Sequence, residues 1–235
     1  MRKGCSVGTV IPALNEERAI GKVLAALPDW VDEVVVADNG STDRTPEVAG
    51  EGGARVVREP RPGYGSACLA GLAALGPHEV VLFLDGDFSD YPEEAGRLVD
   101  PVAEGRVDLV IGSRVRGKRE PGALPAQARF GNWLACRLMA LTWGVSFTDL
   151  GPFRAIRRSA LEGLQMQDRD FGWTIEMQAR ALAHGLRVAE VPVPYRRGIG
   201  PSKISGTLRG VLAAGTKILY TLAREVLRPR PTRWR

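Results

Sequence analysis

Short runs of apolar residues alternate along the first half of the chain with segments in which apolar residues recur every three or four positions. The runs are typical of strands buried on both faces of a parallel sheet, and they cover residues 7–11, 33–37, 54–57, 79–84 and 107–111. The segments between them predict helices over residues 16–27, 42–49, 65–75 and 92–102. This alternation predicts an α/β fold with an open, mostly parallel sheet flanked by helices.

The second half of the chain is less regular. Residues 115–128 are rich in Gly, Pro and Arg and predict a long loop. After it, the pattern predicts a helix over 130–141, a turn at 150–152, a helix over 173–184, a strand over 186–193, a polar loop over 196–205 and an amphipathic helix over 207–226. We therefore expect one domain over residues 1–206 and a C-terminal extension, an amphipathic helix with a basic tail, over 207–235.

Composition is that of a folded globular protein, because 44% of the 235 residues are hydrophobic and 25% are charged. The three cysteines, Cys5, Cys68 and Cys136, are far apart, so we expect free thiols in a reducing compartment rather than a zinc site. The first apolar run stops at Pro12, which disfavours a signal peptide, and no run of 18 apolar residues predicts a membrane span. A cytoplasmic location follows as the expectation.

The formal net charge of +5 is unevenly distributed. Residues 196–235 carry ten Lys or Arg and one acid, a net charge of +9, which leaves −4 for the remainder. Such a block favours phosphates, anionic lipid or nucleic acid as partners. Nucleic acid is the weakest of these, because the charge is confined to one end and no aromatic platform or helix-turn-helix pattern accompanies it.

Polar clusters follow four of the predicted strands, at the edge of the sheet where ligands bind in such folds. Asp85 and Asp87 come directly after the fourth strand. Because residues i and i+2 of an extended segment point the same way, both carboxylates can reach one Mg²⁺ or Mn²⁺ ion, whose shell a diphosphate could complete. Asp38, at the end of the second strand, could accept a hydrogen bond from a nucleobase. Arg61, Gly63 and Gly65 lie at the start of the third predicted helix, over 65–75. The two glycines would let the backbone approach a ligand, and the helix N-terminus with Arg61 suits a phosphate.

Taken together, these motifs resemble those of a known family. Pro12 to Glu16, residues 38–43, Asp85 with Asp87, and residues 112–114 are similar in order and spacing to family 2 of the inverting nucleotide-sugar glycosyltransferases, and most of all to its dolichyl- or polyprenyl-phosphate sugar synthase branch. The resemblance covers roughly residues 6–195. It implies a GT-A fold, with a nucleotide-sugar-binding half over 1–114 and an acceptor half over 115–206, and a UDP- or GDP-sugar as donor.

The resemblance also implies roles for individual residues. Asp85 and Asp87 would bind the metal. The nucleotide-sugar site would consist of Pro12, Leu14, Glu16, Asp38, Asn39, Arg61, Gly63, Gly65, Asp85, Gly86 and Lys203. The acceptor would meet Arg114, Arg129, Arg154, Trp173 and Glu176. Residues 149–154 resemble a family segment that carries Asp149 and Arg154, with Pro152 in place of a glycine.

One stretch departs from the family pattern. Residues 88–92 read Phe-Ser-Asp-Tyr-Pro, where the polyprenyl-phosphate enzymes usually have Leu-Gln-His-Pro-Pro. The glutamine of that motif often helps to bind the metal, so Ser89 or water would replace it here. The C-terminal transmembrane pair of many relatives and the Q-x-x-R-W motif of processive polysaccharide synthases do not occur in this sequence.

The expected reaction is a single in-line sugar transfer with inversion, for which Asp87, Arg114 and Asp149 are the candidate catalytic residues. A hydroxyl acceptor would need a carboxylate base, with Asp149 as first candidate and Glu176 as second. A phosphate acceptor is already ionised and would need arginines instead. Lys203, together with Arg196 or Arg197, is a candidate to neutralise the departing diphosphate, and all three lie on the polar loop of 196–205, which could close over the donor phosphates.

The acceptor is the open question at this stage. The amphipathic final helix favours a peripheral contact with the inner face of the membrane near a lipid phosphate, or else packing on the domain or on a second subunit. A soluble small-molecule acceptor is the alternative. A nucleotidyltransferase is a remote third, because it would want a Gly-rich, Lys-containing loop after the first strand, where this chain has residues 12–16, Pro-Ala-Leu-Asn-Glu.

Overall fold

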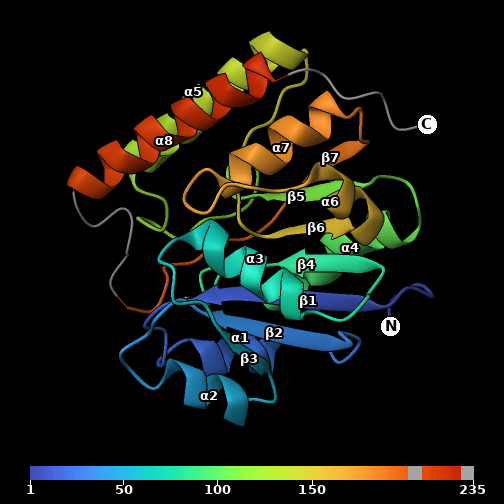
Figure 1. Cartoon of the computed structure of the whole chain (residues 1–235), viewed down its shortest axis with the longest axis vertical. Coiled ribbons are helices and arrows are strands. Elements are labelled where there is room, and N and C mark those ends of the chain that lie inside the picture. The colour runs from blue at the N-terminus through green and yellow to red at the C-terminus, as the bar shows by residue number, and fades with distance from the viewer. Residues whose placement is uncertain (201–207, 229–235) are drawn as a thin grey trace.

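A computed structural model of the chain describes residues 1–200 and 208–228. Its centre is a seven-stranded sheet with the strand order β3-β2-β1-β4-β6-β5-β7 (Figure 1). The strands are β1 (Val7–Ala13), β2 (Glu33–Asp38), β3 (Arg55–Arg58), β4 (Val80–Phe83), β5 (Leu109–Ser113), β6 (Arg154–Arg157) and β7 (Val188–Pro192). All neighbouring pairs are parallel except those of β6, which runs antiparallel to both β4 and β5. The predicted α/β fold with a mostly parallel sheet is confirmed.

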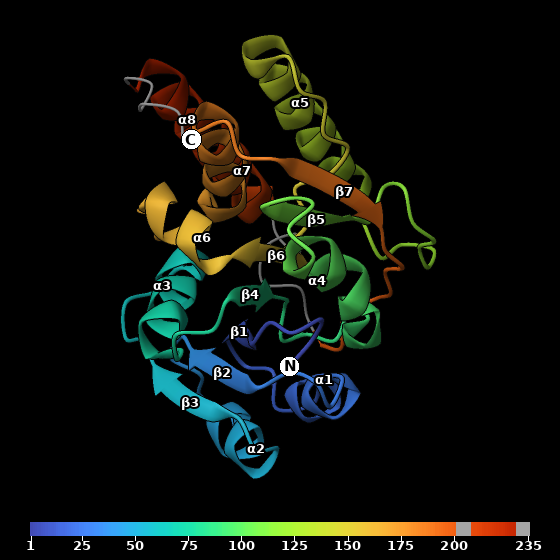
Figure 2. The same ribbon diagram turned by 90° about the vertical axis from the view of Figure 1, so that its right-hand side faces the viewer.

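Helices cover both faces of the sheet, as Figure 2 shows from the side. They are α1 (Ile20–Ala26), α2 (Thr45–Glu51), α3 (Tyr64–Ala74), a 3-10 turn η1 (Pro92–Ala95), α4 (Gly96–Ala103), α5 (Ala126–Trp143), α6 (Arg158–Leu164), α7 (Trp173–Ala183) and α8 (Leu208–Leu227). One apolar core lies between the sheet and α3, α5, α6 and α7. The other lies between the opposite face and α1, α2 and α4.

Several boundaries differ from the prediction. The first helix begins at Ile20 rather than at residue 16, because Asn15 has a left-handed φ of 53° and the chain turns there. Helix α5 begins at Ala126, directly after Pro125, so the predicted loop of 115–128 ends three residues early. The strand β6 and the helix α6 were not predicted at all. Their sequence, with arginines at 154, 157 and 158, shows neither a continuous apolar run nor a clear helical period.

Helices α5 and α8 lie side by side at the end of the molecule away from β3 (Figure 1). Thr221, Leu222 and Glu225 of α8 are buried, so the final helix packs on the domain, one of the two arrangements expected for it. No helix within residues 1–200 and 208–228 is long and apolar enough to cross a membrane. Cys68 and Cys136 are buried, Cys5 is partly buried, and all three are free thiols as expected.

Candidate active site

The carboxyl ends of β1, β2, β4 and β5 lie at one edge of the sheet, since these four strands run parallel to one another. The loop after β1 is fastened to the loop after β2. Asn15 accepts a hydrogen bond from the Thr42 amide at 2.8 Å, and its own amide donates to the hydroxyl of Ser41 at 2.8 Å. Pro12 and Glu16 are buried and Leu14 is partly buried beside this junction. The two loops thus form one wall of the site.

Asp38 and Asn39 shape the second loop. Asp38 is 2% exposed and accepts a hydrogen bond from the Ser41 amide at 3.1 Å. The side chain of Asn39 donates to the carbonyl oxygens of Glu59 and Arg61 at 3.0 and 2.8 Å and accepts from the Gly63 amide at 2.8 Å. Asn39 therefore holds the turn that carries Arg61. Direct binding of the donor by these residues stays a prediction.

Two glycines of this turn meet the protein's own backbone. A Cβ atom at Gly63 would lie 2.1 Å from the carbonyl oxygen of Arg169, and one at Gly65 would lie 2.1 Å from that of Asp168. Gly63 also has a φ of 134°, which side chains rarely adopt. The sequence interpretation, that these glycines make room for a ligand, therefore needs correction. The backbone of residues 168 and 169 fills this space, and it can do so because neither glycine has a side chain.

Asp85 and Asp87 follow β4 at the centre of this edge, and both are partly buried. The hydroxyl of Tyr64 donates to Oδ1 of Asp85 at 3.0 Å, and the amide of Ser89 donates to Oδ1 of Asp87 at 2.9 Å. Burial, together with the carboxylates of Asp87 and Asp90, raises the pKa of Asp85 well above its ordinary value. Burial also raises the pKa of Asp90 to about 7. Three carboxylates are thus crowded into six residues.

This donor set fits a hard divalent cation. Carboxylate oxygens are the ligands that Mg²⁺ and Mn²⁺ prefer, and Oδ1 of Asp90 is buried with no hydrogen-bond partner in the described structure. Gly86 brings the segment close to the first loop, since a Cβ atom there would lie 3.3 Å from the carbonyl oxygen of Pro12. Among the described residues, no three His, Cys, Asp or Glu side chains are grouped to enclose a metal ion by themselves. The expected site needs only two aspartates, because the diphosphate of the donor would supply further oxygen ligands to the cation.

Arg114 and Asp149 form a closed pair beside the aspartates. The guanidinium of Arg114 donates to both carboxylate oxygens of Asp149 at 2.9 and 2.7 Å, and the Arg114 amide adds a third bond at 2.7 Å. Asp149 is fully buried and also accepts from the Leu150 amide at 2.8 Å. The guanidinium carbon of Arg114 lies 5.1 Å from the ring centroid of Tyr195. These contacts indicate that Asp149 orients Arg114. They argue against the expected use of Asp149 as a base.

Three of the predicted acceptor residues lie in the interior. Arg154 is 1% exposed and donates to the carbonyl oxygens of Leu150, Gly151 and Thr174, and burial lowers its pKa to about 10. Trp173 is 1% exposed and packs edge-on against Phe83. Glu176 is fully buried and paired with Arg180 and Arg224. In this structure they support the core beneath the site, and their contact with an acceptor stays a prediction.

The remaining predicted residues are Arg129 and Lys203. Arg129 is exposed near the start of α5. Lys203 and the second half of the predicted lid, residues 201–205, lie outside the described residues. The residues of 195–199, which do belong to the described part, lie against the segment after Asp87, and Arg196 makes the main contact. Tyr64, which lies between Gly63 and Gly65, was not among the predicted site residues, and Arg196 was expected only to act with Lys203 on the donor phosphates. The contacts that the two side chains make here could not be predicted, because their partners are distant in the sequence.

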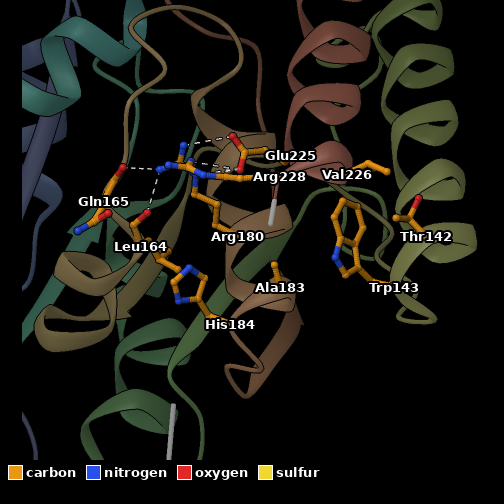
Figure 3. Close-up of a pocket in the computed structure, with 10 residues that line it drawn as sticks. All are labelled: Thr142, Trp143, Leu164, Gln165, Arg180, Ala183, His184, Glu225, Val226 and Arg228. Carbon is orange, nitrogen blue, oxygen red and sulfur yellow. Dashed lines mark hydrogen bonds and ion pairs between the residues drawn. The ribbon is translucent and has the colours of Figure 1, made fainter. Parts of the chain in front are cut away.

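A separate cavity lies between α5, α7 and α8 (Figure 3). Arg180 in its wall donates to Glu225 at 3.0 Å and to the carbonyl oxygens of Leu164 and Gln165. None of the residues that line it belongs to the carboxyl edge of the sheet. The buried charge of Arg180 is paired with that of Glu225 in the same wall. This cavity is therefore not the candidate active site.

Comparison with known proteins agrees with this geometry. A family model described as "Glycosyl transferase family 2" matches residues 9–164. The chain belongs to this family. The glycosyltransferase is 35% identical over 227 residues to a dolichyl-phosphate hexose transferase of Haloferax volcanii, with 94% of this chain and 96% of that protein covered. It is 30% identical to an undecaprenyl-phosphate mannosyltransferase of Micrococcus luteus, with 86% and 88% covered.

Solved structures support the same assignment. The glycosyltransferase is 27% identical, with a TM-score of 0.77, to the glucosyl-3-phosphoglycerate synthase of Mycobacterium tuberculosis. The match covers 96% of this chain and 81% of the other, and that structure contains Mn²⁺, UDP-glucose and phosphoglyceric acid. The expected GT-A fold is therefore confirmed, as are the expected family and enzyme class.

Proposed function

We propose that this glycosyltransferase moves one sugar, with inversion, from a UDP- or GDP-sugar to a polyprenyl-phosphate-like lipid, with Mg²⁺ or Mn²⁺ as cofactor. The observation that carries the proposal is the position of Asp85 and Asp87, at the carboxyl end of β4 and next to the loop that follows β1. In a family of sugar transferases, two carboxylates at this edge suit a cation shared with the donor diphosphate. The structural neighbour that holds Mn²⁺ and UDP-glucose supports the cofactor.

The residues of the site divide the work as follows. Glu16 and Asp38, buried in the wall made by the first two loops, face the nucleoside. Asp85 and Asp87 would hold the cation. When bound, such an ion neutralises the charge that develops on the departing diphosphate. Arg114, held by Asp149, offers a fixed positive charge to the attacking group.

The Arg114–Asp149 pair favours a phosphate as that attacking group. A hydroxyl acceptor requires a base that can take up its proton, yet both oxygens of Asp149 are bound and the side chain is buried. A phosphate monoester is largely ionised at neutral pH, since its second pKa is about 6. A site that presents an oriented arginine instead of a free carboxylate therefore suits a lipid phosphate, as the names of two relatives also suggest.

A surface formed by α5 and α8 would bring the enzyme to such a lipid. Among its described residues, the large exposed apolar side chains are Phe130, Trp133, Leu141, Leu219, Tyr220, Val226 and Leu227. The basic side chains on the same two helices and directly after them include Arg129, Arg137, Lys217, Arg224 and Arg228, whereas Glu225 is buried. Aromatic and basic side chains together are typical of a helix that lies in the interface of an anionic membrane.

A soluble phosphate-bearing acceptor is the second candidate. It is favoured by the structural neighbour, whose complex contains phosphoglyceric acid. It keeps the same donor and the same metal, and it makes the apolar surface of α5 and α8 a place for other contacts, such as a second copy of the chain.

The test is a transfer assay over a panel of nucleotide sugars with Mg²⁺ or Mn²⁺. Each donor is offered polyprenyl phosphate, phosphoglycerate or no acceptor, and the anomeric configuration of the product is determined. Asp87→Ala should abolish metal-dependent transfer. Glu162→Ala, which removes an exposed carboxylate on α6, is the matched control and should not change it.

The outcomes separate the two candidates. Transfer to the lipid phosphate that is lost in Asp87→Ala supports the proposal. Transfer only to phosphoglycerate replaces the lipid with a soluble acceptor. A product with retained configuration contradicts the inverting mechanism, and absence of turnover with every donor contradicts the activity itself.

A further inference from the structure

The stretch of residues 88–92, which departs from the family motif, forms a binding slot for one side chain of the protein itself. The guanidinium of Arg196 lies between two rings, with its central carbon 3.5 Å from the centroid of Phe88 and 3.9 Å from that of Tyr91. Its Nε donates to the carbonyl oxygen of Phe88 at 2.7 Å, and one terminal nitrogen donates to that of Asp90 at 2.8 Å. Arg196 thus contacts this turn in two ways, by stacking on its two rings and by donating hydrogen bonds to its backbone.

The backbone around Arg196 reaches Asp87 itself. The amide of Arg196 donates to the carbonyl oxygen of Ser89 at 3.0 Å, and the amide of Ile199 donates to that of Asp87 at 2.8 Å. A Cβ atom at Gly198 would lie only 2.4 Å from Oδ2 of Asp87. The segment after β7 therefore lies directly against the carboxylate that would bind the metal.

The turn that Arg196 grips needs an external support. Phe88 has a φ of 62°, in the left-handed region that a bulky side chain rarely adopts. Such a conformation persists only where the surroundings impose it. The turn also carries the hydrogen bond from the Ser89 amide to Oδ1 of Asp87. Loosening the turn would therefore release the Asp87 carboxylate from its present orientation.

We propose that Arg196 is a positioning residue, which holds the turn of Phe88 to Tyr91 and so fixes Asp87 in the orientation that receives the divalent cation. The inference rests on the proposed function, because it assumes that Asp87 binds the cation.

The experiment measures Mn²⁺ binding without turnover. The electron paramagnetic resonance signal of free Mn²⁺ is followed in the presence of UDP and, separately, GDP, with no acceptor. Arg196→Gln should weaken Mn²⁺ binding about 10-fold or more, the factor expected when charged hydrogen bonds and a cation–π contact are lost. Arg196→Lys keeps the charge and one donor and should weaken it about threefold.

Arg187→Gln is the matched control. Arg187 lies just before β7, at the opposite end of the strand, and likewise donates to a carbonyl oxygen, that of Gly105, and to Asp108. Its loss should leave Mn²⁺ affinity unchanged. In turnover, Arg196→Gln should raise the Mn²⁺ concentration needed for half-maximal rate, whereas the KM for the donor at saturating Mn²⁺ should stay close to that of the wild type.

A folded Arg196→Gln protein that binds Mn²⁺ with wild-type affinity would overturn the proposal. If that variant does not fold, Tyr91→Leu removes one ring of the slot and leaves the hydrogen bonds of Arg196 in place. An intermediate loss of Mn²⁺ affinity then supports the proposal, and an unchanged affinity overturns it. Failure of the wild-type protein to bind Mn²⁺ with either nucleotide would contradict the proposed function instead, and that failure is seen before any variant is compared.

Discussion

At the scale of single residues, the site depends on hydrogen bonds between segments that are far apart in the sequence. Asn15 fastens the first loop to the second, Asp149 orients Arg114, and Tyr64 holds Asp85. Each of these contacts fixes a side chain that ligand binding would otherwise have to order. Pre-organisation of this kind lowers the entropic cost of binding.

Tyr64→Phe tests the contact on Asp85. The variant keeps the ring and removes only the hydroxyl that donates to Oδ1 of Asp85 at 3.0 Å. We expect kcat/KM for the donor to fall about 3- to 10-fold, the effect of one hydrogen bond of ordinary strength, with little change in thermal stability. Tyr220→Phe, which removes an exposed hydroxyl on α8, should not alter it. Equal kinetics for the two variants would contradict a role for Tyr64.

The sequence predicted the residues whose chemistry is local. Asp85 and Asp87 could be found because two acids at i and i+2 after a buried strand are costly without a partner. The contact of Arg196 with the turn of residues 88–91 could not be predicted, since its partners there lie more than 100 residues earlier in the chain. The pairing of Asp149 with Arg114, which bears on its expected use as a base for a hydroxyl acceptor, could not be predicted either, because it depends on the packing of two distant segments.

At the scale of elements, β6 is the feature that the sequence concealed. It enters the sheet between β4 and β5 and runs antiparallel to both. Arg154 at its start is buried, and backbone carbonyl oxygens satisfy its guanidinium. From the sequence alone, an arginine in a strand is expected at the surface, because the buried acceptors that satisfy it are not visible there. The strands on either side of it, β4 and β5, were predicted correctly, because their continuous apolar runs are typical of buried parallel strands.

Helix α8 is attached to α7 by buried charges. Arg180 is 2% exposed and donates to both carboxylate oxygens of Glu225 at 3.0 and 3.1 Å. Burial opposes ionisation of Glu225, but the hydrogen bonds and charges of Arg180 and Arg224 prevail and lower its pKa. The attachment therefore depends on an ionised carboxylate.

Glu225→Gln should weaken this attachment. We expect a loss of about 2 kcal/mol in the free energy of unfolding at neutral pH, because the buried Arg180 loses one of its two charged partners and keeps only Glu176. A lowered folded-state pKa gives stability that is present above the unfolded pKa and is lost as the pH falls through the folded one. Urea unfolding between neutral pH and about pH 3 should show a shallower acid loss for the variant. Parallel curves would contradict the ion-pair account.

At the scale of the whole molecule, the two helices α5 and α8 form an outer pair beyond the sheet (Figures 1 and 2). The exposed side chains of this pair combine large apolar groups with basic ones. Phe130 and Trp133 are 62% and 55% exposed, and their ring centroids are 5.8 Å apart. A domain would bury such rings if they only served its own stability. Their exposure fits a surface that meets a membrane in the functional state.

Binding to lipid vesicles tests this arrangement in the intact chain. Replacing both Phe130 and Trp133 with Ser should reduce binding to anionic vesicles about 10-fold or more, since each ring would bury well over 100 Å² of apolar surface in the interface. Wild-type binding should also weaken as salt rises, because the basic side chains act through a screened potential. The transfer of sugar to a short, soluble phosphate acceptor should be unaffected in the same variant, since the carboxyl edge of the sheet is untouched. Absence of vesicle binding, or binding that is unchanged in the double variant, would remove this surface from the proposed function and leave the two helices as a contact for another protein chain.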